Sequence, residues 1–164
     1  MPKDASRRRT RRPADDRGNT LVEAALVTPL LILLTLAIVD FASLFYAYLS
    51  LENGVSQATR FAVTGNQLPD PNNPGGQLSR TASIMAAMRA ATPTLTLDDS
   101  AFTFSHMPPG GYGWIAGDGG PGDLERVRVD YTWPLLTPVI RPFFQGGEIH
   151  VTVSSAMKNE GRFQ

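Results

Sequence analysis

The sequence predicts an α+β fold in which a long N-terminal helix, apolar along its first half, continues as the spine of a small antiparallel β-sheet domain. Three observations support this fold class. Residues 21–39 are apolar apart from a few small polar residues and a single charge, Glu23. Apolar residues then recur at three-to-four-residue spacing as far as Val63, as they do along one face of a helix. Strict alternation of apolar and polar residues at 126–133 and 148–157 is typical of half-buried strands.

The first 18 residues are a basic leader. They carry seven basic and three acidic side chains, whereas the rest of the 164-residue chain carries eight basic and twelve acidic ones, so the net charge of zero hides a strong asymmetry. A basic leader indicates either a segment that binds nucleic acid or a segment that orients a neighbouring membrane helix. The apolar run that follows favours the membrane, and we therefore expect no nucleic-acid partner.

Residues 19–40 are predicted to form a transmembrane helix. At about 1.5 Å per residue, residues 21–39 span roughly 28 Å, close to the hydrocarbon thickness of about 30 Å. A buried core helix is the alternative, but a chain of this size would struggle to enclose so long an apolar run. A cleaved secretory signal is disfavoured because bulky residues occupy 41–46, where a signal peptidase needs small ones. The arginine cluster before the run predicts a cytoplasmic N-terminus and an extracytoplasmic domain at 41–164.

Within that domain, the helix is expected to end at Gly65. A second helix is expected at 78–91, with Ser79 as its N-cap and Pro93 after its end. The remaining expected elements, in chain order, are a loop at 68–77, strands at 94–97 and 101–105, a glycine- and proline-rich loop at 107–123, the strand at 126–133, an apolar connection at 134–144 and the strand at 148–157. Successive strands with one apolar face predict an antiparallel sheet, covered by the second half of the long helix.

Residues suited to catalysis or metal binding are sparse. The loose GxGxxA pattern at 111–116 lacks the strand and helix that a dinucleotide site requires. Asp118 and Asp123 flank a glycine stretch that superficially resembles a calcium loop, but a flexible surface loop is the simpler interpretation. His106 and His150 lack metal-ligand spacing, and the chain has no cysteine. We therefore predict no enzyme activity, no cofactor and no metal site.

The segment before the apolar run has two interpretations. In the first, Thr20 and Glu23 form a capping box at the start of the helix, and Gly18 is a hinge. In the second, the segment resembles the processing site of type IV pilins and pseudopilins, which a prepilin peptidase cuts after a glycine. Gly18 then precedes the cut, Asn19 becomes the new N-terminus, and Glu23 matches the glutamate five residues beyond the cut.

A wider pattern resembles one family. The pattern Arg-Gly-x-x-x-Val-Glu-x-Ala-Leu-Val-x-Pro at Arg17–Pro29, the pair Asp40-Phe41 and the element Arg-x-Ala-Val-Thr-Gly at Arg60–Gly65 are similar to the TadE-like proteins, pseudopilins of the tight-adherence (Tad/Flp) pilus machinery. The resemblance implies a pilin-like domain and a minor pseudopilin, anchored in the inner membrane, that acts in pilus assembly through helix–helix association. The partners that it implies are membrane lipid, other pilins or pseudopilins, and the prepilin peptidase.

Two further residues of the helix are candidates for a role in assembly. Pro29 removes a helix hydrogen bond and should bend the helix, which either aids extraction from the bilayer or is simply tolerated. Asp40 either ends the span as an interfacial charge or pairs with another subunit. The alternative function is that of an uncleaved single-span protein whose extracytoplasmic domain binds a protein partner or the cell wall.

Overall fold

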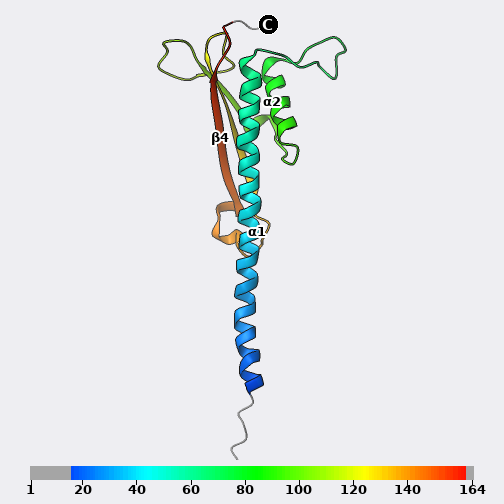
Figure 1. The fold of residues 1–164 in the computed structure, drawn as a ribbon, viewed down its shortest axis with the longest axis vertical. Coiled ribbons are helices and arrows are strands. Elements are labelled where there is room, and N and C mark those ends of the chain that lie inside the picture. The colour runs from blue at the N-terminus through cyan, green and yellow to red at the C-terminus, as the bar shows by residue number, and fades with distance from the viewer. Residues whose placement is uncertain (1–15, 162–164) are drawn as a thin grey trace, which may run out of the picture.

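The computed structural model describes residues 16–161, with side chains described from Gly18 onward, so most of the predicted basic leader lies outside the described residues. The dominant element is α1 (Asp16–Val63), a helix of 48 residues. At about 1.5 Å per residue it is roughly 72 Å long. Figure 1 shows the other elements packed along its C-terminal half, while its N-terminal half extends alone.

The helix begins earlier than the sequence predicted. It includes Asp16, so Thr20 lies inside α1 and the capping box of Thr20 with Glu23 is wrong. Nucleating a helix is costly, but adding a residue to an existing helix is not. The helix formed by the apolar run can therefore extend toward the N-terminus through Gly18, despite a cost of about 1 kcal/mol for a glycine inside a helix. At the other end the prediction is confirmed, because Gly65 adopts a positive φ of 68° and its N–H donates to the Ala62 carbonyl (3.1 Å).

The second helix, α2 (Arg80–Ala91), packs beside the C-terminal half of α1. Ser79 is its N-cap, as predicted, and its side chain accepts a hydrogen bond from the Ala82 N–H (3.2 Å). The two helices meet closely at Gly54 of α1. A Cβ added there would lie 2.5 Å from Thr92 Cγ2 and 3.0 Å from Met88 Sδ.

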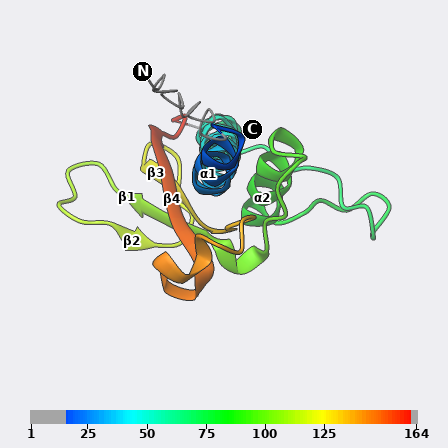
Figure 2. The same ribbon diagram turned by 90° about the horizontal axis from the view of Figure 1, so that it is seen from below.

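The sheet contains four antiparallel strands in the order β2-β1-β3-β4, which confirms the predicted antiparallel sheet. Its strands are β1 (Phe102–Met107), β2 (Ile115–Ala116), β3 (Leu124–Pro134) and β4 (Glu148–Lys158). Viewed along α1, the strands and α2 lie on different sides of the helix (Figure 2). The core thus forms where α1, α2 and the sheet meet. Its buried apolar side chains are Ala47, Leu51, Val55, Ala58, Ala62, Ile84, Met88, Leu95, Leu97, Phe102, Val127, Val129 and Val153.

Two local predictions need correction. Residues 94–97 form a turn and irregular chain, not a strand, although Leu95 and Leu97 are both buried. The Leu95 N–H bonds to the Thr92 carbonyl (3.0 Å) just after α2, so local turn formation replaces sheet pairing there. In the predicted loop 107–123, the two residues of β2 pair with Ser105 and His106 of β1. Met107 belongs to β1, and residues 108–114 and 117–123 are irregular, as predicted.

Candidate functional site

The exposed half of α1 is the most unusual surface among the described residues. Every side chain from 18 to 36 is exposed, and Leu21 exposes 72% of its surface. The large apolar side chains on this half face all directions around the helix, so no polar stripe could face water. They are Leu21, Val22, Leu26, Val27, Leu30, Leu31, Ile32, Leu33, Leu34, Leu36, Ile38 and Val39. A helix this long and apolar suggests a membrane-anchored, single-pass protein.

Gly18, Asn19 and Glu23 lie in the first turns of this exposed half. A Cβ added to Gly18 would meet no atom within 4 Å, so there is open space beside its Cα. Asn19 and Glu23 are four residues apart and therefore share one face of the helix. Cleavage after Gly18 stays a prediction.

Pro29 lies inside α1 and is exposed. It lines a shallow apolar hollow on the helix surface together with Leu21, Ala24, Ala25, Thr28, Ile32, Leu33, Leu36 and, from a distant part of the chain, Val139. The segment that connects β3 to β4 therefore reaches the surface of the exposed half of α1.

Asp40 marks the boundary between the two halves of α1. Its side chain is 1% exposed, and both carboxylate oxygens accept backbone hydrogen bonds: Oδ1 from the Leu136 N–H (2.9 Å) and Oδ2 from the Thr137 N–H (3.1 Å). A buried carboxylate is tolerated when hydrogen bonds replace its hydration. Asp40 thus ties α1 to the β3–β4 connection of its own chain. The sequence offered no signal for this contact, because the two partners are 96 and 97 residues away.

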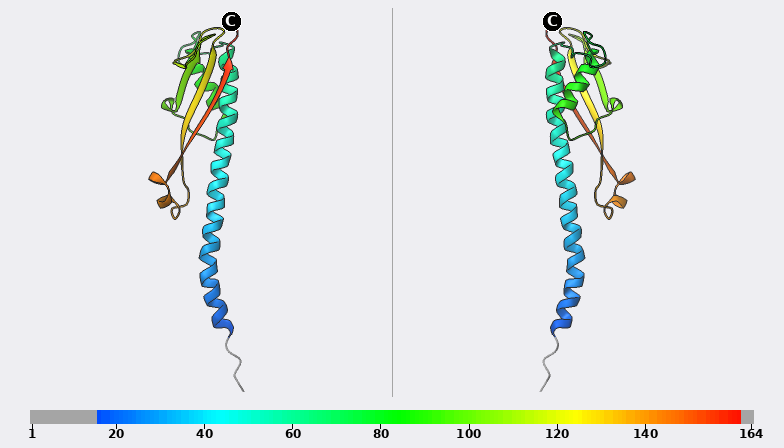
Figure 3. Two further views of the ribbon diagram at one scale, coloured as in Figure 1. Left: turned by 90° about the vertical axis from the view of Figure 1, so that its left-hand side faces the viewer. Right: turned by 90° about the vertical axis from the view of Figure 1, so that its right-hand side faces the viewer.

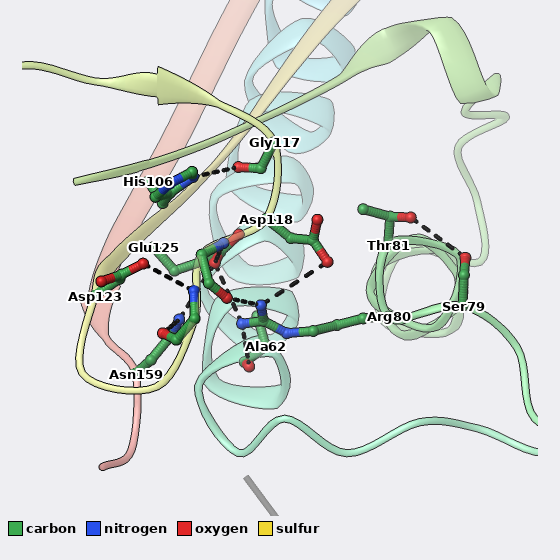
Figure 4. Close-up of polar contacts among 12 residues, drawn as sticks. Ala62, Ser79, Arg80, Thr81, His106, Gly117, Asp118, Asp123, Glu125 and Asn159 are labelled. Atoms are coloured by element: carbon green, nitrogen blue, oxygen red, sulfur yellow. Dashed lines mark hydrogen bonds and ion pairs between the residues drawn. The ribbon is translucent and has the colours of Figure 1, made fainter. Parts of the chain in front are cut away.

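A buried polar cluster holds the opposite end of the domain together (Figure 4). Arg80, at the start of α2, donates through Nη2 to the Ala62 carbonyl (3.0 Å) and to Glu125 Oε2 (3.2 Å), and through Nη1 to the Gly119 carbonyl. Glu125 of β3 is 0% exposed and also accepts from the Gly119 N–H (2.7 Å). Asn159, after β4, donates to Glu125 Oε2 (3.4 Å). The cluster therefore joins the end of α1, α2, the loop before β3 and the end of β4.

This cluster was missed at the sequence level, although a signal existed. Glu125 occupies the inward phase of the β3 alternation, in step with Val127 and Val129, and an acid at such a position requires a buried partner. The nearby acids act locally as well: Asp118 lies 3.9 Å from Arg80 Nη1, and Asp123 Oδ2 accepts from the Gly120 N–H (2.8 Å). Within residues 16–161, no group of three or more His, Asp or Glu side chains could hold a metal ion.

Together these features define a class of protein: an α+β domain built on the second half of a helix whose first half is suited to a single membrane crossing. The family model described as TadE-like protein matches residues 18–60, which confirms the resemblance predicted for this segment. The match begins at Gly18 and stops three residues before α1 ends, so the similarity lies in the helix rather than in the sheet. It suggests a component related to the Tad pilus. No curated protein and no solved structure matches the chain.

Proposed function

We propose that the protein is a minor pseudopilin of a Tad-type pilus, anchored in the inner membrane with its N-terminus in the cytoplasm. The observation that carries the proposal is the exposed apolar half of α1, which lies within the TadE-like match to residues 18–60. The chain acts structurally: the helix first holds the domain at the membrane and then associates with the apolar helices of other pilins or pseudopilins.

Processing by a prepilin peptidase prepares this association. Removal of residues 1–18 leaves the α-amino group of Asn19 at the start of the helix. Glu23 follows four residues later on the same face, so its carboxylate can neutralise that amino group, on its own chain or on a neighbouring one. An unpaired charge in an apolar surrounding is costly, and this pairing therefore fixes the register of adjacent helices.

The N-terminal residue of the protein isolated from native membranes tests the processing step. We expect Asn19 at the N-terminus and an intact mass lacking residues 1–18. A Gly18→Leu variant should keep its full mass, because the larger side chain blocks access to the scissile backbone. Glu23→Gln serves as the matched variant: it should still be cut but should lose incorporation into the assembly. A native N-terminus at Met1 or Pro2 would contradict the processing step.

The second candidate is an uncleaved, single-span protein whose extracytoplasmic domain binds a protein partner or the cell wall. The loop between β1 and β3 favours it, because Tyr112 is fully exposed and Ile115 is half exposed. Figure 1 shows this loop at the end of the domain where α1 ends. An uncut chain whose partner is lost when Tyr112 is replaced by Ser would support this candidate over the pseudopilin.

A further inference from the structure

The connection between β3 and β4, residues 135–147, has an unusual surface for a loop. Its only charged residue is Arg141. Leu135 is buried against α1 and Ile140 is half-buried beside it, but four large apolar side chains of the loop are exposed, and Phe143 exposes 80% of its surface. The exposed set is Leu136, Val139, Phe143 and Phe144. Large apolar side chains gathered on one exposed loop usually mark a contact with another apolar phase.

The position of this loop along α1 identifies that phase. Asp40 binds the loop at Leu136 and Thr137, at the residue where α1 stops being exposed on all sides. Val139 lies beside the apolar surface that contains Leu36, and Leu36 is four residues, about 6 Å, further toward the N-terminus than Asp40. In Figure 3 the orange turns of the loop lie at the lower tip of the sheet, to one side of α1, and beyond them only the helix continues.

We propose that residues 135–147 form a membrane-interface anchor that places Val139 and Phe143 in the lipid at the domain's side of the bilayer. This inference rests on the proposed membrane anchoring of α1. With residues 21–39 in the hydrocarbon, the loop lies at the boundary, where apolar segments bury about 5–10 Å into the headgroup and acyl region. Its apolar surface is continuous with that of the spanning helix, which favours lipid over a second protein as the occupant.

Two features of the loop suit this position. Phenylalanine rings bury a large apolar area at low conformational cost, and Arg141 places a positive charge where lipid phosphates lie. Arg141 Nε donates to the Leu135 carbonyl (2.8 Å), which fixes the side chain along the loop. Asp40, in turn, is shielded from lipid by the same loop. The domain is thus held at the membrane at two points, the helix and the loop, which fixes its depth and tilt.

Single-cysteine labelling tests the proposal, because the chain contains no cysteine. The full chain is reconstituted into vesicles of phosphatidylcholine and phosphatidylglycerol with an environment-sensitive fluorophore at Phe143→Cys. Tyr112→Cys is the matched control, an exposed aromatic at the far end of the domain, and Leu30→Cys marks the spanning helix. Each label is exposed to aqueous iodide and, separately, to lipids that carry a nitroxide on the acyl chain.

We expect the label at 143 to be quenched by the nitroxide lipid, as at 30, and to be several-fold less sensitive to iodide than the label at 112. Equal iodide quenching at 143 and 112 would overturn the interface anchor. So would protection from both quenchers, because a protein surface would then cover the loop. If the label at 30 also stays outside the lipid, the membrane anchoring itself fails, and the two failures are thereby separated.

Discussion

Replacing Gly54 by alanine tests how α1 and α2 pack. Gly54 lies in the buried half of α1, and a Cβ placed on it would lie 2.5 Å from Thr92 Cγ2, well inside van der Waals contact. Thr92 is 1% exposed and its hydroxyl donates to the Met88 carbonyl (2.9 Å), so its methyl group cannot rotate away freely. The helices must therefore separate slightly or adopt strained side-chain conformations.

Two opposing effects set the magnitude. Overpacking in a close-packed core costs about 1–3 kcal/mol, whereas alanine gains up to about 1 kcal/mol over glycine in a helix interior. We expect Gly54→Ala to lower the free energy of unfolding by about 1–2 kcal/mol, since the contact is with a rigid β-branched side chain. A companion change, Thr92→Ser, deletes the methyl group and keeps the hydroxyl. Gly54→Ala should therefore cost much less free energy of unfolding in a Thr92→Ser chain than it does in the unaltered chain.

The assay is urea unfolding of the full chain in detergent, followed by tryptophan fluorescence; of the two tryptophans, Trp133 packs against the core. A loss of this size corresponds to a midpoint shift of roughly 0.5–1 M. Gly18→Ala is the matched control, a glycine of the same helix whose added Cβ meets no atom within 4 Å. Gly54→Ala behaving like Gly18→Ala, or showing no coupling to Thr92→Ser, would refute the close packing.

Three further predictions use the same unfolding assay. Asp40→Asn should cost about 1–3 kcal/mol, because an amide can replace only one of the two acceptor oxygens and leaves a buried N–H unpaired; an unchanged midpoint would contradict the contact. Glu125→Gln should cost about 3 kcal/mol, because only the part-exposed Asp118 then faces the buried charge of Arg80, and Glu125→Leu combined with Arg80→Met should recover part of this loss, since the Gly119 N–H still lacks its acceptor. The Arg128 guanidinium lowers the pKa of Asp130 below its usual 3.8, so this pair stabilises the fold above pH 3.8 and loses its effect as the pH falls further. Since both side chains are about half exposed, we expect a small loss that high salt reduces and Asp130→Asn abolishes.

Periodic patterns in the sequence predicted the elements that bury one face. The three-to-four-residue repeat predicted the spine, and from Val55 to Ala62 its apolar face packs into the core. At 41–49 the repeat misses the buried face, because Ala47 is buried there while Phe41, Phe45 and Leu49 are exposed. Alternation predicted β3 and β4 because one face of each strand is more buried than the other. The pattern at 94–97 misled for a physical reason: Leu95 and Leu97 are buried one after the other by a turn that passes over the core. Burial alternates there without any sheet pairing.

The contacts that place the domain on the helix could not be predicted in this way. Asp40 with Leu136, and Arg80 with Glu125, join residues far apart in the chain. Of these residues, Glu125 alone stood out in its local sequence, and nothing there pointed to Arg80 as its partner. Asp40 looked like the charged end of a membrane span because nothing nearby could bury it. Only the return of the chain after β3 supplies the two N–H groups that do so.

Because Asp40 is buried, the two acids near the ends of the apolar segment have different roles. Asp40 has both oxygens bonded to its own chain, whereas Glu23 is exposed at the start of the helix. Within residues 18–40, Glu23 is therefore the acid available to a positive charge on another subunit. About 26 Å of helix separates the two, close to the thickness of the hydrocarbon layer. In the proposed assembly, Asp40 and the loop 135–147 fix the domain at one face of the membrane, and Glu23 sets the register of neighbouring helices at the other.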